Sequence, residues 1–94
     1  MKLSIRSPEE LGSIIRAVRK HARVRQDDLA GTANVSKQFA VDAERGKATM
    51  QFGKLLQLLD ELGITLTVDI ADDIEPTLKK IEARRADGSP GKNP

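Results

Sequence analysis

The chain contains no cysteine, tryptophan or tyrosine, and its one histidine is His21. The absence of cysteine excludes a disulfide framework, a thiolate metal site and a cysteine nucleophile. Aromatic residues make up 2% of the chain, which argues against a protein that stacks single-stranded bases on aromatic rings. We therefore expect no metal, no cofactor and no enzymatic activity, and we interpret His21 as a surface residue.

Long hydrophobic runs are also missing. No apolar run approaches the roughly 18 residues of a membrane span, and the N-terminus lacks the basic-then-apolar layout of a signal peptide. The 94 residues, 38% hydrophobic and 32% charged, allow one compact domain. These features predict a small cytoplasmic protein that does not associate with membranes.

Charge is distributed unevenly along the chain. Residues 1–47 carry ten lysines and arginines against six acids, a net charge of +4 in a chain whose total is +2, so the remainder is negative. A basic half joined to an acidic half suggests that one side faces a polyanion and the other a different kind of partner.

Cap residues and a 3.6-residue periodicity predict a series of helices. The first begins at residues 7–10, where Ser-Pro-Glu-Glu combines an N-cap, a proline suited to the first helical position and a capping-box glutamate. The second spans residues 26–33, and the third runs from a Ser36 cap to about Arg45. Asn34 favours the left-handed conformation of a tight turn, so these two helices form a helix-turn-helix.

A fourth, leucine-rich helix is predicted after a Thr49 cap and ends at Gly63. The apolar period then changes from 3.6 to 2, which predicts one β-strand with Ile64, Leu66, Val68 and Ile70 on one face. A lone strand is unstable, so it needs either residues 3–5 or the same strand of a second subunit as its partner. The acidic tail that follows is expected to hold a short helix over residues 77–85 and to be disordered over residues 86–94.

The segment from Gln26 to Lys47 resembles the helix-turn-helix of Cro and phage repressors, the XRE family. The resemblance rests on Gln26, the Leu29-Ala30 pair, Asn34 at the turn, Val35 after it and the ending Glu44-Arg45-Gly46-Lys47. With the flanking helices it covers about residues 8–63 and implies a mainly α, lambda-repressor-like domain of four to five helices. Ala40 and Ala43 depart from the pattern, which has larger aliphatic residues there, so the third helix is expected to be thinly anchored unless Phe39 compensates.

The resemblance implies two kinds of DNA contact. Phosphate contacts fall on Arg25, Gln26 and Lys47, which provide affinity and salt dependence without sequence choice. It also implies an ion pair between Arg19 of the first helix and Glu44 at the end of the third, which fixes the recognition helix against the body.

The base-reading positions correspond to the exposed N-terminal part of the third helix. They are Ser36, Lys37 and Gln38, with Asp42 one turn further on. Lys37 can donate to guanine O6 and N7, and Gln38 can pair with adenine N6 and N7. Asp42 can accept from cytosine N4 or, alternatively, stay solvated outside the groove.

The order of elements is similar to that of HipB-type antitoxins, on the strength of the Gly46-Lys47-Ala48-Thr49 junction and the terminal strand. That family dimerises through its terminal strands, represses its own operon and binds a HipA-type serine/threonine kinase toxin. The resemblance implies a dimeric repressor of a palindromic double-stranded operator, with residues 1–70 as the DNA-binding and dimerisation domain and residues 71–94 as a tail. Two alternatives stay open: a solitary XRE-type regulator without a toxin, and a protein-interaction module that has lost DNA binding.

Overall fold

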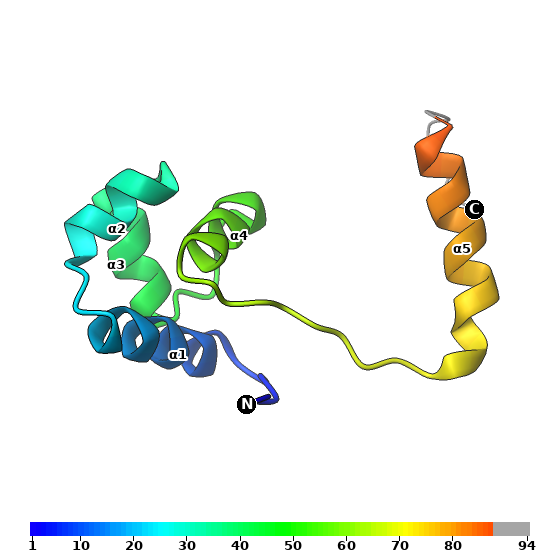
Figure 1. Ribbon diagram of the computed structural model, residues 1–94, viewed down its shortest axis with the longest axis horizontal. Coiled ribbons are helices and arrows are strands. Elements are labelled where there is room, and N and C mark those ends of the chain that lie inside the picture. The colour runs from blue at the N-terminus through cyan, green and yellow to red at the C-terminus, as the bar shows by residue number, and fades with distance from the viewer. Residues whose placement is uncertain (88–94) are drawn as a thin grey trace.

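The computed structural model describes residues 1–87, and within them all regular secondary structure is helical (Figure 1). The elements are α1 (Pro8–His21), α2 (Gln26–Ala33), α3 (Lys37–Arg45), α4 (Phe52–Glu61), the 3₁₀ turn η1 (Asp72–Ile74) and α5 (Glu75–Ala86). Helices α1 to α4 pack into one body, while α5 stands apart at the end of an extended segment (Figure 1). None of the described helices is both long and apolar enough to cross a membrane.

Serine caps fix where α1 and α3 begin. Ser7 Oγ accepts from the Glu10 N–H at 3.1 Å, and Ser36 Oγ accepts from the Phe39 N–H at 3.0 Å, so both predicted caps are confirmed. Each bond satisfies an N–H group that has no partner inside its helix. The Glu10 carboxylate accepts from the N–H of Arg6, the residue before the cap, at 2.7 Å. In the predicted capping box it would instead accept from the N–H of the cap residue, Ser7.

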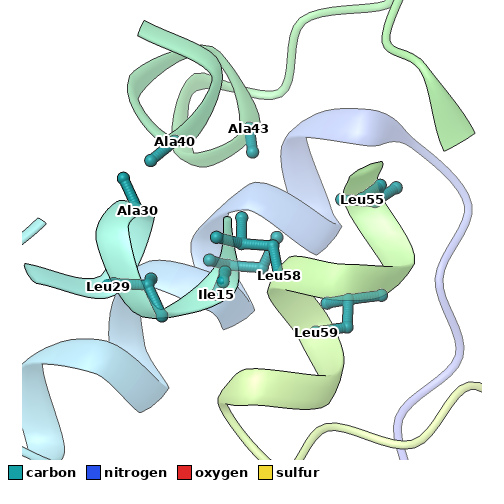
Figure 2. Packing of buried hydrophobic residues seen from close by; sticks show 9 residues of the cluster. Ile15, Leu29, Ala30, Ala40, Ala43, Leu55, Leu58 and Leu59 are labelled. Atoms are coloured by element: carbon teal, nitrogen blue, oxygen red, sulfur yellow. The ribbon is translucent and has the colours of Figure 1, made fainter. Parts of the chain in front are cut away.

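The core is aliphatic and lies where α1 to α4 meet (Figure 2). Its buried hydrophobic residues are Ile15, Leu29, Ala30, Ala33, Ala40, Ala43, Leu55, Leu58 and Leu59. Helix α4 supplies three of its four leucines, so this leucine-rich helix is central to the core. Complete burial of a leucine stabilises a fold by about 2 kcal/mol, so Leu58 and Leu59 are among the strongest single contributors.

Small residues bring α1 and α3 into backbone contact. A Cβ added to Gly12 of α1 would lie 2.6 Å from the Glu44 carbonyl oxygen and 2.7 Å from that of Ala43. Ala40 and Ala43 are both fully buried, and Phe39 is partly buried against the core. The expectation of a thinly anchored third helix is therefore wrong, because the alanines allow a close approach that larger side chains would prevent.

Residues 64–70 form no strand in the part of the chain that the structure describes. They run as an extended segment between α4 and η1 and make no ladder with residues 3–5 (Figure 1). The predicted pairing within one chain is therefore not formed. A strand exists only as part of a ladder, and the single chain offers this segment no partner. Pairing between two subunits stays a prediction.

Two helices also have boundaries that differ from the prediction. Helix α4 begins at Phe52 with Gln51 as its N-cap, and not after Thr49; Gln51 makes no side-chain cap bond, so no local signal marks this start. The tail helix, Glu75–Ala86, is longer than predicted at both ends and Asp87 is its C-cap, so the expected disorder is wrong at residues 86 and 87. The remainder of that expectation, for residues 88–94, lies outside the described residues.

Candidate nucleic-acid interface

The helix-turn-helix is built by a three-residue connection between α2 and α3. Asn34 adopts the left-handed conformation, with φ 59° and ψ 43°, as its residue type predicted. The Val35 N–H donates to the Ala30 carbonyl at 3.0 Å, and Ser36 then caps α3. At the other end Gly46 has φ 77° and ends the helix by donating to the Ala43 carbonyl. These local devices set the length and direction of α3.

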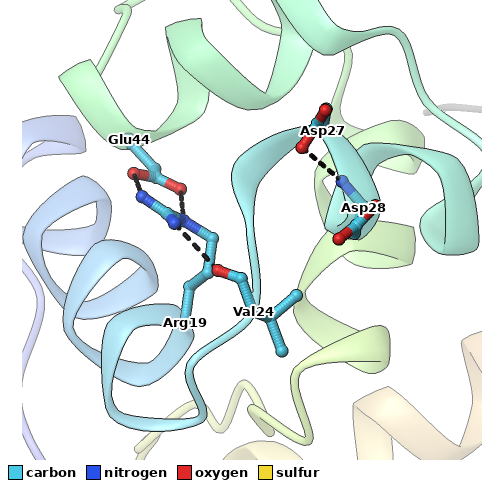
Figure 3. A network of polar contacts seen from close by, with 5 residues as sticks. All are labelled: Arg19, Val24, Asp27, Asp28 and Glu44. Atoms are coloured by element: carbon cyan, nitrogen blue, oxygen red, sulfur yellow. Dashed lines mark hydrogen bonds and ion pairs between the residues drawn. The ribbon is translucent and has the colours of Figure 1, made fainter.

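An ion pair ties α3 to α1. Arg19 donates to Glu44 twice, from Nε at 2.5 Å and from Nη2 at 2.9 Å, in a two-pronged geometry (Figure 3). The side chains are only 11% and 2% exposed, so solvent screens the pair weakly. The hydrogen bonds to Glu44 raise the pKa of Arg19 above its ordinary value, and this outweighs the lowering by burial. The guanidinium therefore stays charged throughout the physiological pH range, and the structure places the pair as the resemblance implied.

Arg19 also holds the loop between α1 and α2. Its Nη1 donates to the Val24 carbonyl at 3.0 Å (Figure 3), just after Arg23 passes through a left-handed conformation with φ 60°. This bond directs the chain toward Arg25 at the start of α2. The sequence alone does not indicate a role for Val24, because its contribution is a main-chain carbonyl and leaves no signal in residue type.

The predicted base-reading residues lie together at the N-terminal end of α3. Ser36, Lys37 and Gln38 are all exposed. The Ser36 oxygen is engaged as the cap, which leaves its hydroxyl hydrogen free to donate. Gln38 Nε2 donates to Asp42 Oδ1 at 2.9 Å, and Lys47 Nζ lies 3.6 Å from Asp42 Oδ2. Asp42 is therefore engaged by two neighbours, and its contact with cytosine N4 stays a prediction.

The predicted phosphate contacts lie at the opposite ends of the motif. Arg25 is the N-cap residue of α2, and its exposed guanidinium lies 3.3 Å from the Asp27 carboxylate. Gln26 is the first residue of α2, where free N–H groups favour an anion. The Asp28 N–H is already taken by the Asp27 side chain at 3.1 Å (Figure 3). Lys47 follows α3 and is about half exposed.

The predicted dimer residues lie outside this surface. Ile64 packs partly against the core, whereas Leu66, Val68 and Ile70 are exposed along the extended segment. Residues 1–87 contain no group of three or more His, Asp or Glu side chains placed to hold a metal ion.

A short helix with an exposed polar N-terminal end, set by a tight turn and fixed to the body, is the arrangement with which helix-turn-helix proteins enter the major groove. Fold and site thus define a helix-turn-helix protein. The chain is 46% identical over 68 residues to an uncharacterized HTH-type transcriptional regulator of Sinorhizobium fredii (strain NBRC 101917 / NGR234), y4mF, covering 72% of this chain and 90% of the relative. The chain belongs to the HTH-type transcriptional regulators. No protein-family profile matches it.

Solved structures share the fold at low sequence identity. A chain from a HipA–HipB–O2–O3 complex superposes with a TM-score of 0.68 at 18% identity, covering 76% of this chain and all of the other. HipB in a complex with an O4 20mer gives a TM-score of 0.68 at 20% identity, with the same coverage. A restriction–modification controller protein gives 0.55 at 20% identity, covering 85% of this chain and 96% of its own. The chain therefore has a HipB-like fold.

Proposed function

We propose that this regulator is a cytoplasmic, dimeric, sequence-specific repressor of its own operon and the antitoxin of a toxin–antitoxin pair. The observation that carries the DNA-binding part is the exposed polar end of α3, Ser36 to Gln38, on a helix that the buried Arg19–Glu44 pair locks to the body. A reading helix must be rigidly oriented, because hydrogen bonds to base edges tolerate little displacement.

Affinity and sequence choice are divided between different residues in this proposal. Arg25, Gln26 and Lys47 contact phosphates and fix the register of the protein on the duplex. Lys37 and Gln38 contact base edges, with Ser36 as a further donor. The first group supplies the salt-dependent part of the binding energy, and the second supplies the preference for one operator.

The proposed dimer uses residues 1–70, with Leu66, Val68 and Ile70 pairing across a two-fold axis. The apolar side chains of this segment, 85% exposed at Val68, support a partner surface, since hydrophobic groups gathered in one exposed patch often mark an interface. Val68→Lys is expected to lower dimer affinity in light scattering, while Thr67→Lys, on the other face of the segment, leaves it nearly unchanged. A Val68→Lys variant that is as dimeric as the wild type contradicts this assignment.

The proposed toxin partner is a HipA-like serine/threonine kinase. The support is the shared fold with HipB, which has been solved together with HipA. Co-expression with a HipA-like kinase encoded beside this chain, followed by affinity capture of one through the other, tests the pairing. Absence of such a gene or of capture leaves a solitary regulator.

The central experiment is a fluorescence-anisotropy titration of the full chain with its own upstream DNA and with a scrambled duplex, at several salt concentrations. A two-fold dimer reads half-sites about 34 Å apart or a small multiple of that distance. We expect tight, salt-sensitive binding with a large preference for the upstream DNA. Equal or absent binding to both duplexes contradicts autoregulation, and absent binding to a randomised library as well indicates a protein-interaction module.

A further inference from the structure

Asp42 is engaged on both sides by residues assigned to the DNA surface. Its Oδ1 accepts from Gln38 Nε2 at 2.9 Å, one turn earlier on α3, and its Oδ2 lies 3.6 Å from Lys47 Nζ, just after the helix. The Asp42 side chain is 23% exposed, against 53% for Lys47. The carboxylate therefore lies partly covered beside Gln38.

The contact with Asp42 dictates the orientation of the Gln38 amide. A carboxylate is an acceptor only, so it must face the NH₂ side of the amide and not its oxygen. One Gln38 N–H is thereby used, while Oε1 and the second N–H remain available. Gln38 then presents one acceptor and one donor to the DNA.

Such a pair matches adenine and does not match guanine. In the major groove adenine offers the N6 donor and the N7 acceptor, whereas guanine offers two acceptors, O6 and N7. An amide free to turn can direct both N–H groups toward guanine. An amide fixed by Asp42 keeps its oxygen turned toward one of guanine's acceptors.

We propose that Asp42 is a specificity-determining positioning residue that fixes the Gln38 amide for adenine and against guanine, and not itself a reader of cytosine. The inference rests on the proposed DNA-binding function. Lys47 supports it by neutralising a carboxylate that phosphates would otherwise repel. Asp42 therefore acts through Gln38.

The test compares Asp42→Asn with Asp28→Asn in the full chain. Asp42→Asn keeps the size of the side chain but can face Gln38 with either its oxygen or its NH₂ group, so the amide is no longer fixed. Asp28 is an exposed acid on α2 and provides the same loss of charge away from Gln38. The probe is a library of randomised duplexes of about 20 base pairs, two half-sites one DNA turn apart, selected by each protein and sequenced.

Gln38→Ala identifies the operator position that Gln38 reads. There the wild type is expected to prefer adenine over guanine on the order of tenfold or more, the usual discrimination of a bidentate contact. In Asp42→Asn and Asp42→Ala the preference falls to about threefold or less, while Asp28→Asn keeps it. Circular dichroism on each variant reports whether the helices stay folded.

Three results overturn the inference. The first is an Asp42→Asn variant that keeps the wild-type adenine preference, and the second is a Gln38→Ala variant that loses no preference at any position. Loss of a cytosine preference elsewhere, with adenine retained, shows that Asp42 reads a base directly. A wild type that selects no sequence at all refutes instead the proposed function, and this outcome is recognisable before any variant is made.

Discussion

Removing one partner of the Arg19–Glu44 pair should destabilise the protein severely. Glu44→Leu replaces a side chain that is 2% exposed and leaves Arg19, 11% exposed, with two of its three hydrogen bonds lost. Breaking a buried ion pair in this way costs about 3 to 5 kcal/mol. We expect the lower value, about 3 kcal/mol, because Arg19 retains its bond to the Val24 carbonyl.

Removing both partners should lower the free energy of unfolding by much less than the sum of the two single substitutions. In the Arg19→Met/Glu44→Leu variant no buried charge is left alone, and apolar side chains of similar size fill the space. The carbonyl of Val24 loses its donor, so the double variant is expected within about 1 to 2 kcal/mol of the wild type. Sites that do not interact would instead give additive losses.

The assay is urea unfolding followed by far-ultraviolet circular dichroism, since the chain has no tryptophan or tyrosine for fluorescence. Protein concentration is held constant, because dimerisation would add to the apparent stability. For a domain of this size a loss of 3 kcal/mol lowers Tm by about 12 to 24 °C. A Glu44→Leu variant less than about 1 kcal/mol below the wild type, or a double variant as unstable as the sum of the singles, refutes the reasoning.

The other predictions concern the α1–α3 contact and the DNA surface. Gly12→Ala should lower the free energy of unfolding by about 1 to 3 kcal/mol, because its Cβ would press on backbone oxygens of α3, whereas Gly31→Ala, which meets nothing within 4 Å, should not destabilise. Equal melting curves for the two variants would contradict this packing. Lys37→Ala should weaken operator binding by about 1 to 3 kcal/mol and relax one position. Arg25→Ala should weaken binding to all sequences alike and reduce the salt slope by about one; indistinguishable library profiles would contradict the division of roles.

The parts of the fold that the sequence predicted are those that short segments determine. Ser7 and Ser36 cap their helices, and Asn34 takes the left-handed conformation, because each effect depends on one side chain and the backbone beside it. The Arg19–Glu44 geometry joins residues 25 positions apart, and only resemblance to a known motif suggested it. The polar end of α3 likewise followed from its place in the motif.

The features that the sequence did not predict depend on contacts between distant parts of the chain. The tight α1–α3 packing needs Gly12 opposite the main chain at Ala43, and neither residue alone indicates it. The role of the Val24 carbonyl has no residue-type signal. The Asp42 contacts depend on the rotamers of Gln38 and Lys47, which spacing permits but does not require.

The position of the ion pair explains how a small, aliphatic domain can hold α3 rigid. Two features of α3 restrict its motion against α1: the backbone contact at Gly12 limits approach, and the Arg19–Glu44 pair limits separation and rotation. Because Arg19 also holds the Val24 carbonyl, the same guanidinium sets the path of the chain into α2, where the proposed phosphate contacts begin. The proposed phosphate contacts and the proposed base contacts thus both depend on the position of one buried group, the Arg19 guanidinium. Loss of that group should therefore reduce operator preference more than non-specific affinity, since base contacts depend on alignment and phosphate attraction depends mainly on charge.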